Sequence, residues 1–307
     1  MYKSPNFNNK TILITGGAGF IGSNLAFYFQ ENFPNSNIII FDCFRSDKTF
    51  SNGNFTSFGH YKNLIGFKGD IICGNINNQT DLRLLNAYKF DYIFHQAAIS
   101  DTRVYDQEII MKTNVNSFYD LLAIAKKNGA IMVYASSAAT YGNLPSPQTV
   151  GKENPENPYG FSKLLMDQIA TRYSNENPNM TIVGLRFFNV YGNRMSLDGA
   201  YRLAIPIFAS QIKEGKPCTI FNDGNQKRDF VHVDDVVDAN ILVANHKSSF
   251  KGDIYNVGSS TNYSINEIAD MFGGEKEYGE KRIEPFETLG ETLKSKKSLD
   301  FFAIPLG

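Results

Sequence analysis

The stretch "TILITGGAGFIGSNLAFYF" at residues 11–29 constrains the fold most, because an apolar strand pattern runs directly through glycines into a helix pattern. Gly16, Gly19 and Gly22 form the spacing G-x-x-G-x-x-G. In this setting the first glycine allows a tight turn, the second lets the backbone approach a pyrophosphate, and the third lets helix and strand pack closely. A helix beginning near Phe20 would point its N–H groups and positive dipole end at the phosphates. We therefore expect a bound dinucleotide.

The second expected strand ends at Asp42, where an acid would bond the hydroxyls of the adenosine ribose. This acid favours NAD, because its charge would repel a 2′-phosphate. Arg45 follows in "FDCFRS" and would pair with such a phosphate, although it is equally compatible with a solvated side chain. The cofactor is therefore predicted as NADP or NAD, one per chain and tightly bound.

Short apolar runs alternate with longer amphipathic ones through the first half of the chain. Runs rich in Ile, Val and aromatic residues predict strands at 11–15, 37–41, 69–73, 91–98, 130–137 and 181–189. Helical patterns lie between them at 20–31, 80–88, 108–128 and 160–174. This alternation predicts right-handed βαβ units and an α/β fold, a Rossmann-type doubly wound parallel sheet.

The second half is less regular and predicts a smaller C-terminal lobe. Its expected elements are helices near 200–214, 234–246 and 264–272, and strands at 218–222 and 253–258. We divide the chain into a dinucleotide-binding domain at 1–189 and a mainly substrate-binding lobe at 190–307, with interleaved segments. The charged stretch 275–297 is predicted as a solvated surface segment, and the final "FFAIPLG" is an apolar end that looks cut short.

Composition excludes several classes of protein. Of 307 residues, 42% are hydrophobic and 20% charged, and the net charge is −1, so neither nucleic acid nor a membrane is expected as a partner. No apolar run approaches the roughly 20 residues that span a bilayer, and the first ten residues lack the apolar segment of a signal peptide. Cys43, Cys73 and Cys218 have no spacing typical of disulfide frameworks or metal sites. A cytoplasmic protein without a metal is expected.

The stretch "NPYGFSKLLMDQ" places Tyr159 and Lys163 four positions apart at the start of an expected helix. With 16 tyrosines in the chain, such a spacing arises by chance, so the context must decide. Ser136 and Ser137 end the fifth expected strand. Ligands of doubly wound sheets bind at the carboxyl ends of the strands, so we expect both serines to face the cofactor and the helix to lie alongside.

This arrangement suits removal of a sugar hydroxyl proton while a hydride leaves the same carbon. The step needs a base near neutral pH, and a free tyrosine, with a pKa of about 10, is too fully protonated. A lysine ammonium on the same helix face would lower the pKa of the tyrosine. Ser137 would hydrogen-bond the reacting oxygen and hold it between Tyr159 and the nicotinamide. Ser137, Tyr159 and Lys163 are therefore the predicted catalytic residues.

The chain also contains several further motifs that matter for its family: "GGAGFIG", "HQAA" (95–98), "SSAATYG", "YGFSK", "RFFNVYG" (186–192) and "KRDFVHVDDV" (227–236). Together they resemble the extended short-chain dehydrogenase/reductase family over nearly the whole chain. The resemblance implies a nucleotide-diphosphate sugar as substrate and a homo-oligomer. It also implies that Asn189 contacts the diphosphate, that Arg228 pairs with a phosphate and that Arg103 lines the site. The alternatives are a bond closing the loop of Asn189 and a salt bridge from Arg228 to an acid such as Asp234.

The resemblance also indicates residues around the cofactor. His95 and Asn114 are expected to support the cofactor loop rather than to act in catalysis. The predicted cofactor-binding set comprises Gly16, Gly19, Phe20, Ile21, Gly22, Asp42, Arg45, Asn75, Ile76, Gln96, Ala97, Ala98, Asn114, Tyr159 and Lys163.

Within the family, "SFGHYKNLIGFKGDI", "HQAAISDT" and "ASSAATYGNLPSPQTVGKENPENPYGFSK" look most like ADP-glycero-manno-heptose 6-epimerases of lipopolysaccharide biosynthesis. These enzymes oxidise C6 transiently and return the hydride after the ketone has presented its other face. Their second acid/base is a lysine beyond "FNVYG", a position that Asp198 holds here. Asp198 is therefore a further catalytic candidate.

Four alternatives remain open, one of them a dehydrogenase or reductase that releases its cofactor. The stretch "GAYRLAIPIFASQIKEGKP" is similar to nucleotide-sugar 4-epimerases, which need one base and would act on a UDP- or GDP-sugar. A 4,6-dehydratase would carry an Asp–Glu pair where Ala138 and Ala139 stand. A dinucleotide sensor without chemistry would typically have lost the tyrosine or the lysine.

Overall fold

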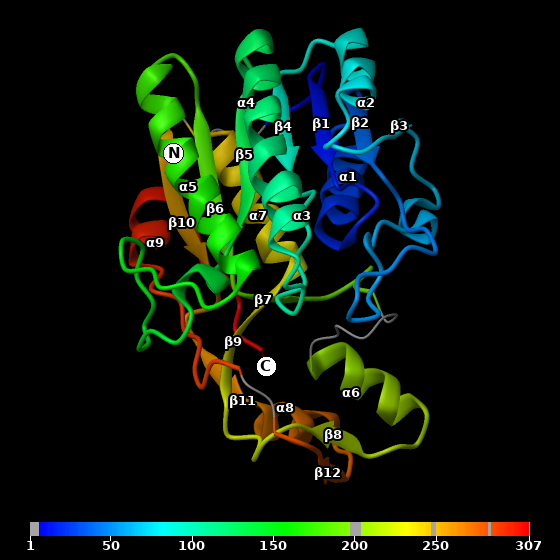
Figure 1. The fold of residues 1–307 in the computed structure, drawn as a ribbon, viewed down its shortest axis with the longest axis vertical. Helices are drawn as coiled ribbons and strands as arrows, with labels where there is room; N and C mark the ends of the chain where they lie inside the picture. The colour runs from blue at the N-terminus through cyan, green and yellow to red at the C-terminus, as the bar shows by residue number, and fades with distance from the viewer. Residues whose placement is uncertain (1–5, 197–203, 247–249, 282–283, 307) are drawn as a thin grey trace.

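The computed structural model describes residues 6–196, 204–246, 250–281 and 284–306, and its centre is a parallel sheet of seven strands (Figure 1). In spatial order these are β10 (Lys251–Val257), β6 (Ile182–Phe187), β5 (Ile131–Ser137), β4 (Tyr92–His95), β1 (Thr11–Thr15), β2 (Asn37–Asp42) and β3 (Asp70–Cys73). The order of connection reverses between β1 and β4. Such a switch point is where doubly wound sheets bind ligands, at the carboxyl ends of the strands.

Helices cover both faces of the sheet because the central strands are apolar on both sides. On one face, Leu25 and Phe29 of α1 (Phe20–Asn32) share a buried core with Val236 of α7 (Val233–Ala244). The other face carries α2 (Gln79–Arg83), α4 (Ser117–Asn128) and α5 (Pro158–Glu176), which bury residues such as Leu82, Phe118, Leu122, Met166 and Ile169. A short α3 (Gln107–Ile110) and a π-helical turn at Met111–Asn116 lead into α4.

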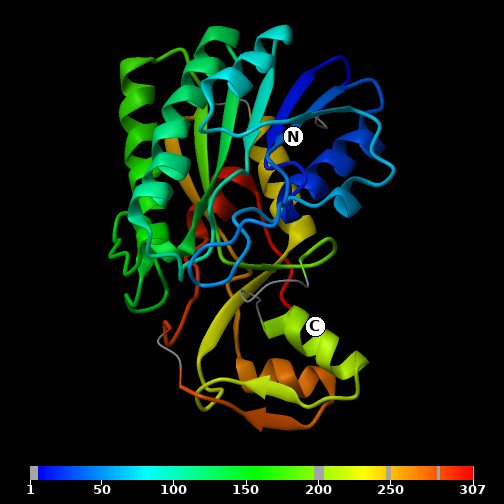
Figure 2. The ribbon, with the colours of Figure 1, turned by 45° about the vertical axis from the view of Figure 1, so that its right-hand side comes forward.

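The smaller lobe lies beyond the carboxyl ends of the strands, and Figure 2 shows the yellow strand β9 extending from this lobe up to helix α7. It contains α6 (Ala204–Lys213), α8 (Ile265–Phe272), a β12–β8 pair (Lys276–Tyr278, Cys218–Ile220) and a β11–β9–β7 sheet (Asn262–Ser264, Lys227–His232, Asn189–Tyr191). Phe208, Ile220, Phe230 and Ile268 form its own core. Helix α9 (Leu293–Leu299) returns to the large sheet, where Leu299 joins the core beside α1 and α7.

Two elements that were expected in the smaller lobe lie at the large sheet instead, one as a strand of it and one as a helix on its face. This corrects the sequence analysis. The strand expected at 253–258 is β10, which pairs in parallel with β6, and the helix expected at 234–246 is α7, which packs on α1. The physical reason is burial: Tyr255 and Val257 of β10 are almost fully buried beside β6.

Several boundaries also differ from expectation. The strand expected at 91–98 ends at His95, and the one expected at 181–189 breaks after Phe187 into β6 and β7. The helix expected at 108–128 is interrupted by the π-helical turn, and β9 was not expected at all. The stretch 275–297 is not merely solvated, because it supplies β12 and much of α9 and contacts β9.

Within the described residues, no helix is both long and apolar enough to cross a membrane. Nor do three His, Cys, Asp or Glu side chains come together anywhere in that part of the chain in a way that would hold a metal ion.

Candidate functional site

The glycine loop joins β1 to α1 at the switch point. Gly16 has φ +70°, and a Cβ there would lie 2.7 Å from the backbone nitrogen of Ala97 in the loop after β4. A Cβ at Gly22 would lie 2.3 Å from the backbone oxygen of Gly16, so this glycine allows α1 to pack against the turn. Helix α1 begins with Gly19 as its N-cap, without a side-chain cap and without an acid in its first turn. This end of the helix suits an anion such as a pyrophosphate.

Asp42 is buried at the end of β2 and braces the glycine loop. Its Oδ2 accepts the N–H of Ala18 at 3.0 Å, and its Oδ1 accepts the N–H of Phe44 at 2.8 Å. Burial raises the pKa of the carboxyl, against the lowering effect of these two bonds. Arg45 follows, with its guanidinium carbon 4.7 Å from the centre of the Phe55 ring.

The loops after β3 and β4 complete the expected cofactor side of the sheet. Asn75 is exposed and accepts the N–H of Asn77 at 2.9 Å, while the Ile76 side chain is buried in the core. Gln96 donates to Asn240 of α7 at 3.3 Å, and its buried Oε1 has no partner in the described part of the chain. Ala97 and Ala98, which follow Gln96, lie beyond the end of β4. The glycine loop would receive the pyrophosphate, and a donor on the ligand would pair with the buried Oε1 of Gln96. Both features fit a bound dinucleotide.

His95 and Asn114 are buried at the end of β4 and beside the loop that follows it. Burial lowers the pKa of His95 to about 3, so the ring is neutral, and its Nδ1 lies 2.7 Å from the hydroxyl oxygen of Thr15. The Asn114 amide accepts the N–H of Ile99 at 2.9 Å and donates to the Ser162 hydroxyl at 2.9 Å. Asn114 therefore ties the loop after β4 to helix α5.

Helix α5 carries Tyr159 in its first turn and Lys163 one turn later. Asn157 caps the helix by accepting the N–H of Gly160 at 2.8 Å, and Pro158 stands in the first turn, where its missing N–H costs nothing. Lys163 is almost fully buried, donates to the backbone oxygen of Ala135 at 2.7 Å, and lies 5.9 Å from the centre of the Tyr159 ring. Burial lowers the pKa of Lys163 to about 8.

Replacing Asn157 by alanine is expected to lower the free energy of unfolding by about 1 kcal/mol, because the N–H of Gly160 loses its acceptor. Urea unfolding would measure the change. The same substitution at Asn175, exposed on α5, is the matched control and should be neutral or slightly stabilising, since alanine is the better helix former. Equal losses in both variants would contradict the capping role.

Ser137 ends β5 and begins the turn Ala138–Tyr141, where its Oγ accepts the N–H of Ala139 at 3.1 Å. A Cβ at Gly160 would lie 2.4 Å from the backbone oxygen of Ala139, so this glycine lets the start of α5 approach the turn closely. The Ser137 hydroxyl still has its own hydrogen to donate. The turn and the helix thus bring together the elements that carry Ser137 and Tyr159.

Ser136 corrects the expectation that both serines face the cofactor. Its hydroxyl donates to Asp167 of α5 at 3.0 Å and is buried beneath the helix. Neighbouring residues of a strand point to opposite faces, which separates Ser136 from Ser137. Sequence reasoning also missed Asp167 and its partner Arg186, which lie 2.8 Å apart. An arginine inside the apolar run "TIVGLRFF" was the available signal, because buried cations need partners.

Two of the residues predicted to bind substrate, Asn189 on β7 and Arg228 on β9, lie where these strands meet the smaller lobe. The Asn189 amide donates to the backbone oxygen of Asp229 at 3.0 Å and approaches the Thr288 hydroxyl at 3.3 Å. Arg228 is buried and forms a salt bridge of 2.7 Å, with Glu284 rather than with Asp234 as its partner. The acid therefore comes from the charged stretch 275–297.

Arg103 is partly exposed after β4, and its Nε lies 3.2 Å from Asp101. Asp198, the candidate second base, lies outside the described residues.

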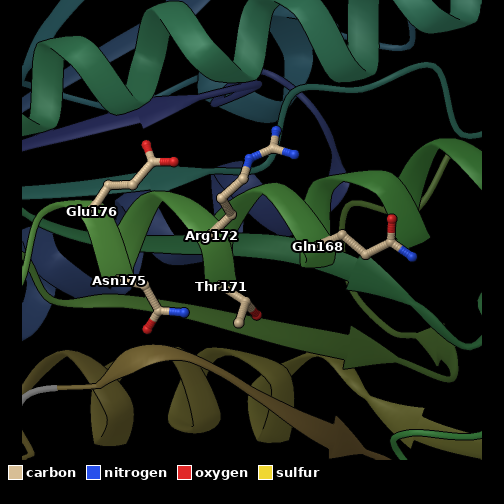
Figure 3. A pocket seen from close by; sticks show the side chains of 5 residues that line it. All are labelled: Gln168, Thr171, Arg172, Asn175 and Glu176. Atoms are coloured by element: carbon tan, nitrogen blue, oxygen red, sulfur yellow. The ribbon is translucent and has the colours of Figure 1, made fainter.

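A surface pocket of about 590 Å³ lies on a different face of α5 and is not this site. Figure 3 shows Arg172 and Glu176 pointing to one side of the helix and Thr171 and Asn175 to the other. Arg172 donates to Tyr119 of α4 at 2.6 Å.

The model of the NAD dependent epimerase/dehydratase family matches residues 12–258. The chain belongs to this family. The family is described as NAD dependent, in agreement with the predicted class of cofactor.

Two relatives are described as ADP-L-glycero-D-manno-heptose-6-epimerases. An ADP-L-glycero-D-manno-heptose-6-epimerase of Brachyspira hyodysenteriae is 34% identical over 262 residues, which cover 84% of this chain and 79% of the relative. The crystal structure of the Helicobacter pylori enzyme of the same name superposes with a TM-score of 0.85 at 42% identity, covering all of this chain and 94% of that one. The family and the α/β fold predicted from the sequence are therefore confirmed.

A third relative is a Bacillus cereus UDP-glucuronic acid 4-epimerase, solved in complex with UDP-glucuronic acid and NAD. It superposes with a TM-score of 0.80 at 26% identity, covering 97% of this chain and 94% of that one.

Proposed function

We propose that this protein is a nucleotide-diphosphate-sugar epimerase that acts on an ADP-glycero-manno-heptose at C6. The observation that carries the choice of substrate is the 42% identity to the Helicobacter pylori 6-epimerase along the whole chain, against 26% for the 4-epimerase. The arrangement of Ser137, Tyr159 and Lys163 at the carboxyl edge of the sheet supports the chemistry.

A bound nicotinamide dinucleotide would accept a hydride from the sugar and return it. Tyr159 would take the proton of the sugar hydroxyl during oxidation and return it during reduction. Lys163, as an ammonium below the ring, would favour the ionised phenol. Ser137 would donate its hydroxyl hydrogen to the reacting oxygen and hold it in line. Asp198 stays a candidate for a second acid/base.

The remaining assignments are part of the same proposal. Asp42 would bond the adenosine ribose, and Arg45 would pair with a 2′-phosphate if the cofactor is NADP. Asn189, Arg228 and Arg103 would bind the substrate, and for Arg228 this requires sharing or exchanging its bond to Glu284. The protein would act in the cytoplasm. It would also form a homo-oligomer, and analytical ultracentrifugation would test that oligomeric state.

Proton NMR in deuterated water would test the function. The purified protein is given ADP-D-glycero-D-manno-heptose in one tube and UDP-galactose in another, and mass spectrometry of the released cofactor decides between NAD and NADP. Conversion of the heptose alone, without deuterium at C6, is the expected result, because the hydride returns to the carbon that lost it.

The main alternative is a 4-epimerase, which the 26% identity to the Bacillus cereus enzyme favours. Conversion of UDP-galactose alone would replace our proposal by this one. If neither sugar reacts, the proposed substrate is wrong.

A further inference from the structure

Four buried or nearly buried charges of alternating sign lie beneath the catalytic end of α5. Lys163 and Asp167 are one helical turn apart on α5, and each is at most 2% exposed. Asp167 contacts Arg186 of β6 at 2.8 Å, and Arg186 contacts Glu153 at 2.7 Å. Charges are rarely buried to this extent unless each one has a partner.

The environment of Asp167 consists of hydrogen-bond donors. Its Oδ1 accepts the hydroxyl of Tyr134 at 2.9 Å, and its Oδ2 accepts the hydroxyl of Ser136 at 3.0 Å. Arg186 donates to Oδ2 from Nε at 2.9 Å, and its terminal nitrogen forms an ion pair of 2.8 Å with the same oxygen. Burial raises the pKa of Asp167, and Arg186 opposes that effect. The guanidinium can only donate, so the arrangement favours an ionised carboxylate.

Lys163 needs such a charge nearby. Burial lowers its pKa to about 8, and the charge of Asp167 acts in the opposite direction. Within the described part of the chain, His95 is neutral, Tyr134 is a phenol that donates to Asp167, and the Tyr159 ring lies 5.9 Å from the ammonium, so none of these three supplies the charge. Arg186 contacts the same carboxylate and brings a positive charge.

We propose that Asp167 is a positioning residue for the reaction, whose carboxylate keeps Lys163 in its ammonium form below Tyr159 while Arg186 and Glu153 hold that carboxylate in place. The inference rests on the proposed roles of Tyr159 and Lys163. Without the Asp167 charge, Arg186 would keep only Glu153 as its acid partner, and Lys163 would lose the carboxylate that opposes the effect of burial. An arginine does not give up its proton in proteins, so Lys163 would lose its own at a lower pH.

The same network also reaches the turn that follows Ser137. The guanidinium carbon of Arg186 lies 4.9 Å from the centre of the Tyr141 ring, and the Tyr141 hydroxyl donates to Asn256 of β10 at 2.6 Å. A loss of Asp167 could therefore disturb geometry as well as charge. The test must separate these two effects.

The experiment measures the titration of Lys163 directly in Asp167→Asn. Protein carrying lysine labelled with carbon-13 at Cε is titrated by NMR, and the Lys163 signal is identified by its absence in Lys163→Met. We expect the wild-type signal to titrate near pH 8 and the Asp167→Asn signal at least about one unit lower. Tyr134→Phe is the matched control, because it removes one hydrogen bond to Asp167 and keeps the charge. Its midpoint should stay within about 0.3 units of wild type.

The pH profile of kcat/KM gives the second readout. Activity that needs the ammonium is lost as pH rises through the pKa of Lys163, so the alkaline limb of Asp167→Asn should move down by about one unit. At pH 8.5, its activity relative to its own maximum should be about eightfold below that of wild type.

An unchanged Lys163 midpoint in Asp167→Asn would overturn the inference, even if activity falls, because the residue would then be merely structural. If the single variant does not fold, Asp167→Asn with Arg186→Met removes both charges of the pair. The Lys163 midpoint should then still fall below that of wild type, by less than in the single variant because the Arg186 charge is also gone, and an unchanged midpoint would overturn the inference. A wild type that epimerises no sugar refutes the proposed function, whereas the NMR titration still decides the electrostatic claim.

Discussion

Replacing Tyr159 by phenylalanine is expected to lower kcat by about 10²- to 10⁴-fold, the usual contribution of a positioned acid/base. The substitution keeps the ring that lies over Lys163 and removes only the hydroxyl that exchanges a proton with the sugar. Ground-state binding does not depend on that exchange, so KM should change far less than kcat. Initial rates of sugar conversion by NMR would measure both constants.

Two controls separate lost chemistry from lost structure. Tyr105→Phe makes the same change at a side chain that is 71% exposed, and it should keep its rate within about twofold of wild type. Retained cofactor and unchanged thermal unfolding of Tyr159→Phe would exclude misfolding as the cause of a lower rate. If Tyr159→Phe kept more than a tenth of the wild-type kcat, Tyr159 would not be the base.

The local structure that the sequence predicted at the candidate site is encoded in short windows. The glycine spacing and the pair Tyr159–Lys163 each occupy a single turn or a single strand–helix junction, where geometry follows from adjacent residues. The separation of Ser136 from Ser137 was equally local. It follows from the alternation of side chains along a strand, which our expectation did not apply.

What the sequence did not predict depends on contacts between distant segments. Strand β10 joins β6 although Lys251 and Ile182 are far apart in the chain, and no local pattern distinguishes such an edge strand from one in a separate lobe. The partner of Arg228 was expected among its neighbours, whereas Glu284 comes from a stretch interpreted as solvated surface. A charged composition does not exclude a structural role when one acid of the stretch neutralises a buried cation.

The ion pair of Asp167 and Arg186 has a local signal in the sequence, but it also depends on contacts between distant segments. An arginine within an apolar strand signals a buried acid somewhere, but choosing Asp167 requires knowing that α5 packs across β5 and β6. The sequence could therefore predict that a partner exists, and only the fold identifies it.

Replacing Gly16 by alanine should lower the free energy of unfolding and weaken cofactor binding. Gly16 has φ +70°, which costs an L-residue roughly 1–2 kcal/mol. Its new Cβ would also lie 2.7 Å from the nitrogen and 2.8 Å from the Cα of Ala97, and these are backbone atoms that cannot rotate away. Overpacking of this kind costs typically 1–3 kcal/mol more, so the unfolding free energy should fall by about 2–5 kcal/mol.

Gly129→Ala is the matched control, because Gly129 has nearly the same φ, +67°, at the end of α4, and its Cβ would meet nothing within 4 Å. It should lose only the conformational part, roughly 1–2 kcal/mol, and keep its cofactor. Urea unfolding without added dinucleotide measures the loss of unfolding free energy, and unfolding with it measures how much the dinucleotide stabilises each variant. Added dinucleotide should stabilise Gly129→Ala as it stabilises wild type, and should stabilise Gly16→Ala much less, because Gln96–Ala98 must move to admit the methyl group. Equal losses and equal stabilisation in the two variants would mean that the loop after β4 yields freely and that the close approach at Gly16 is not what shapes the cofactor site.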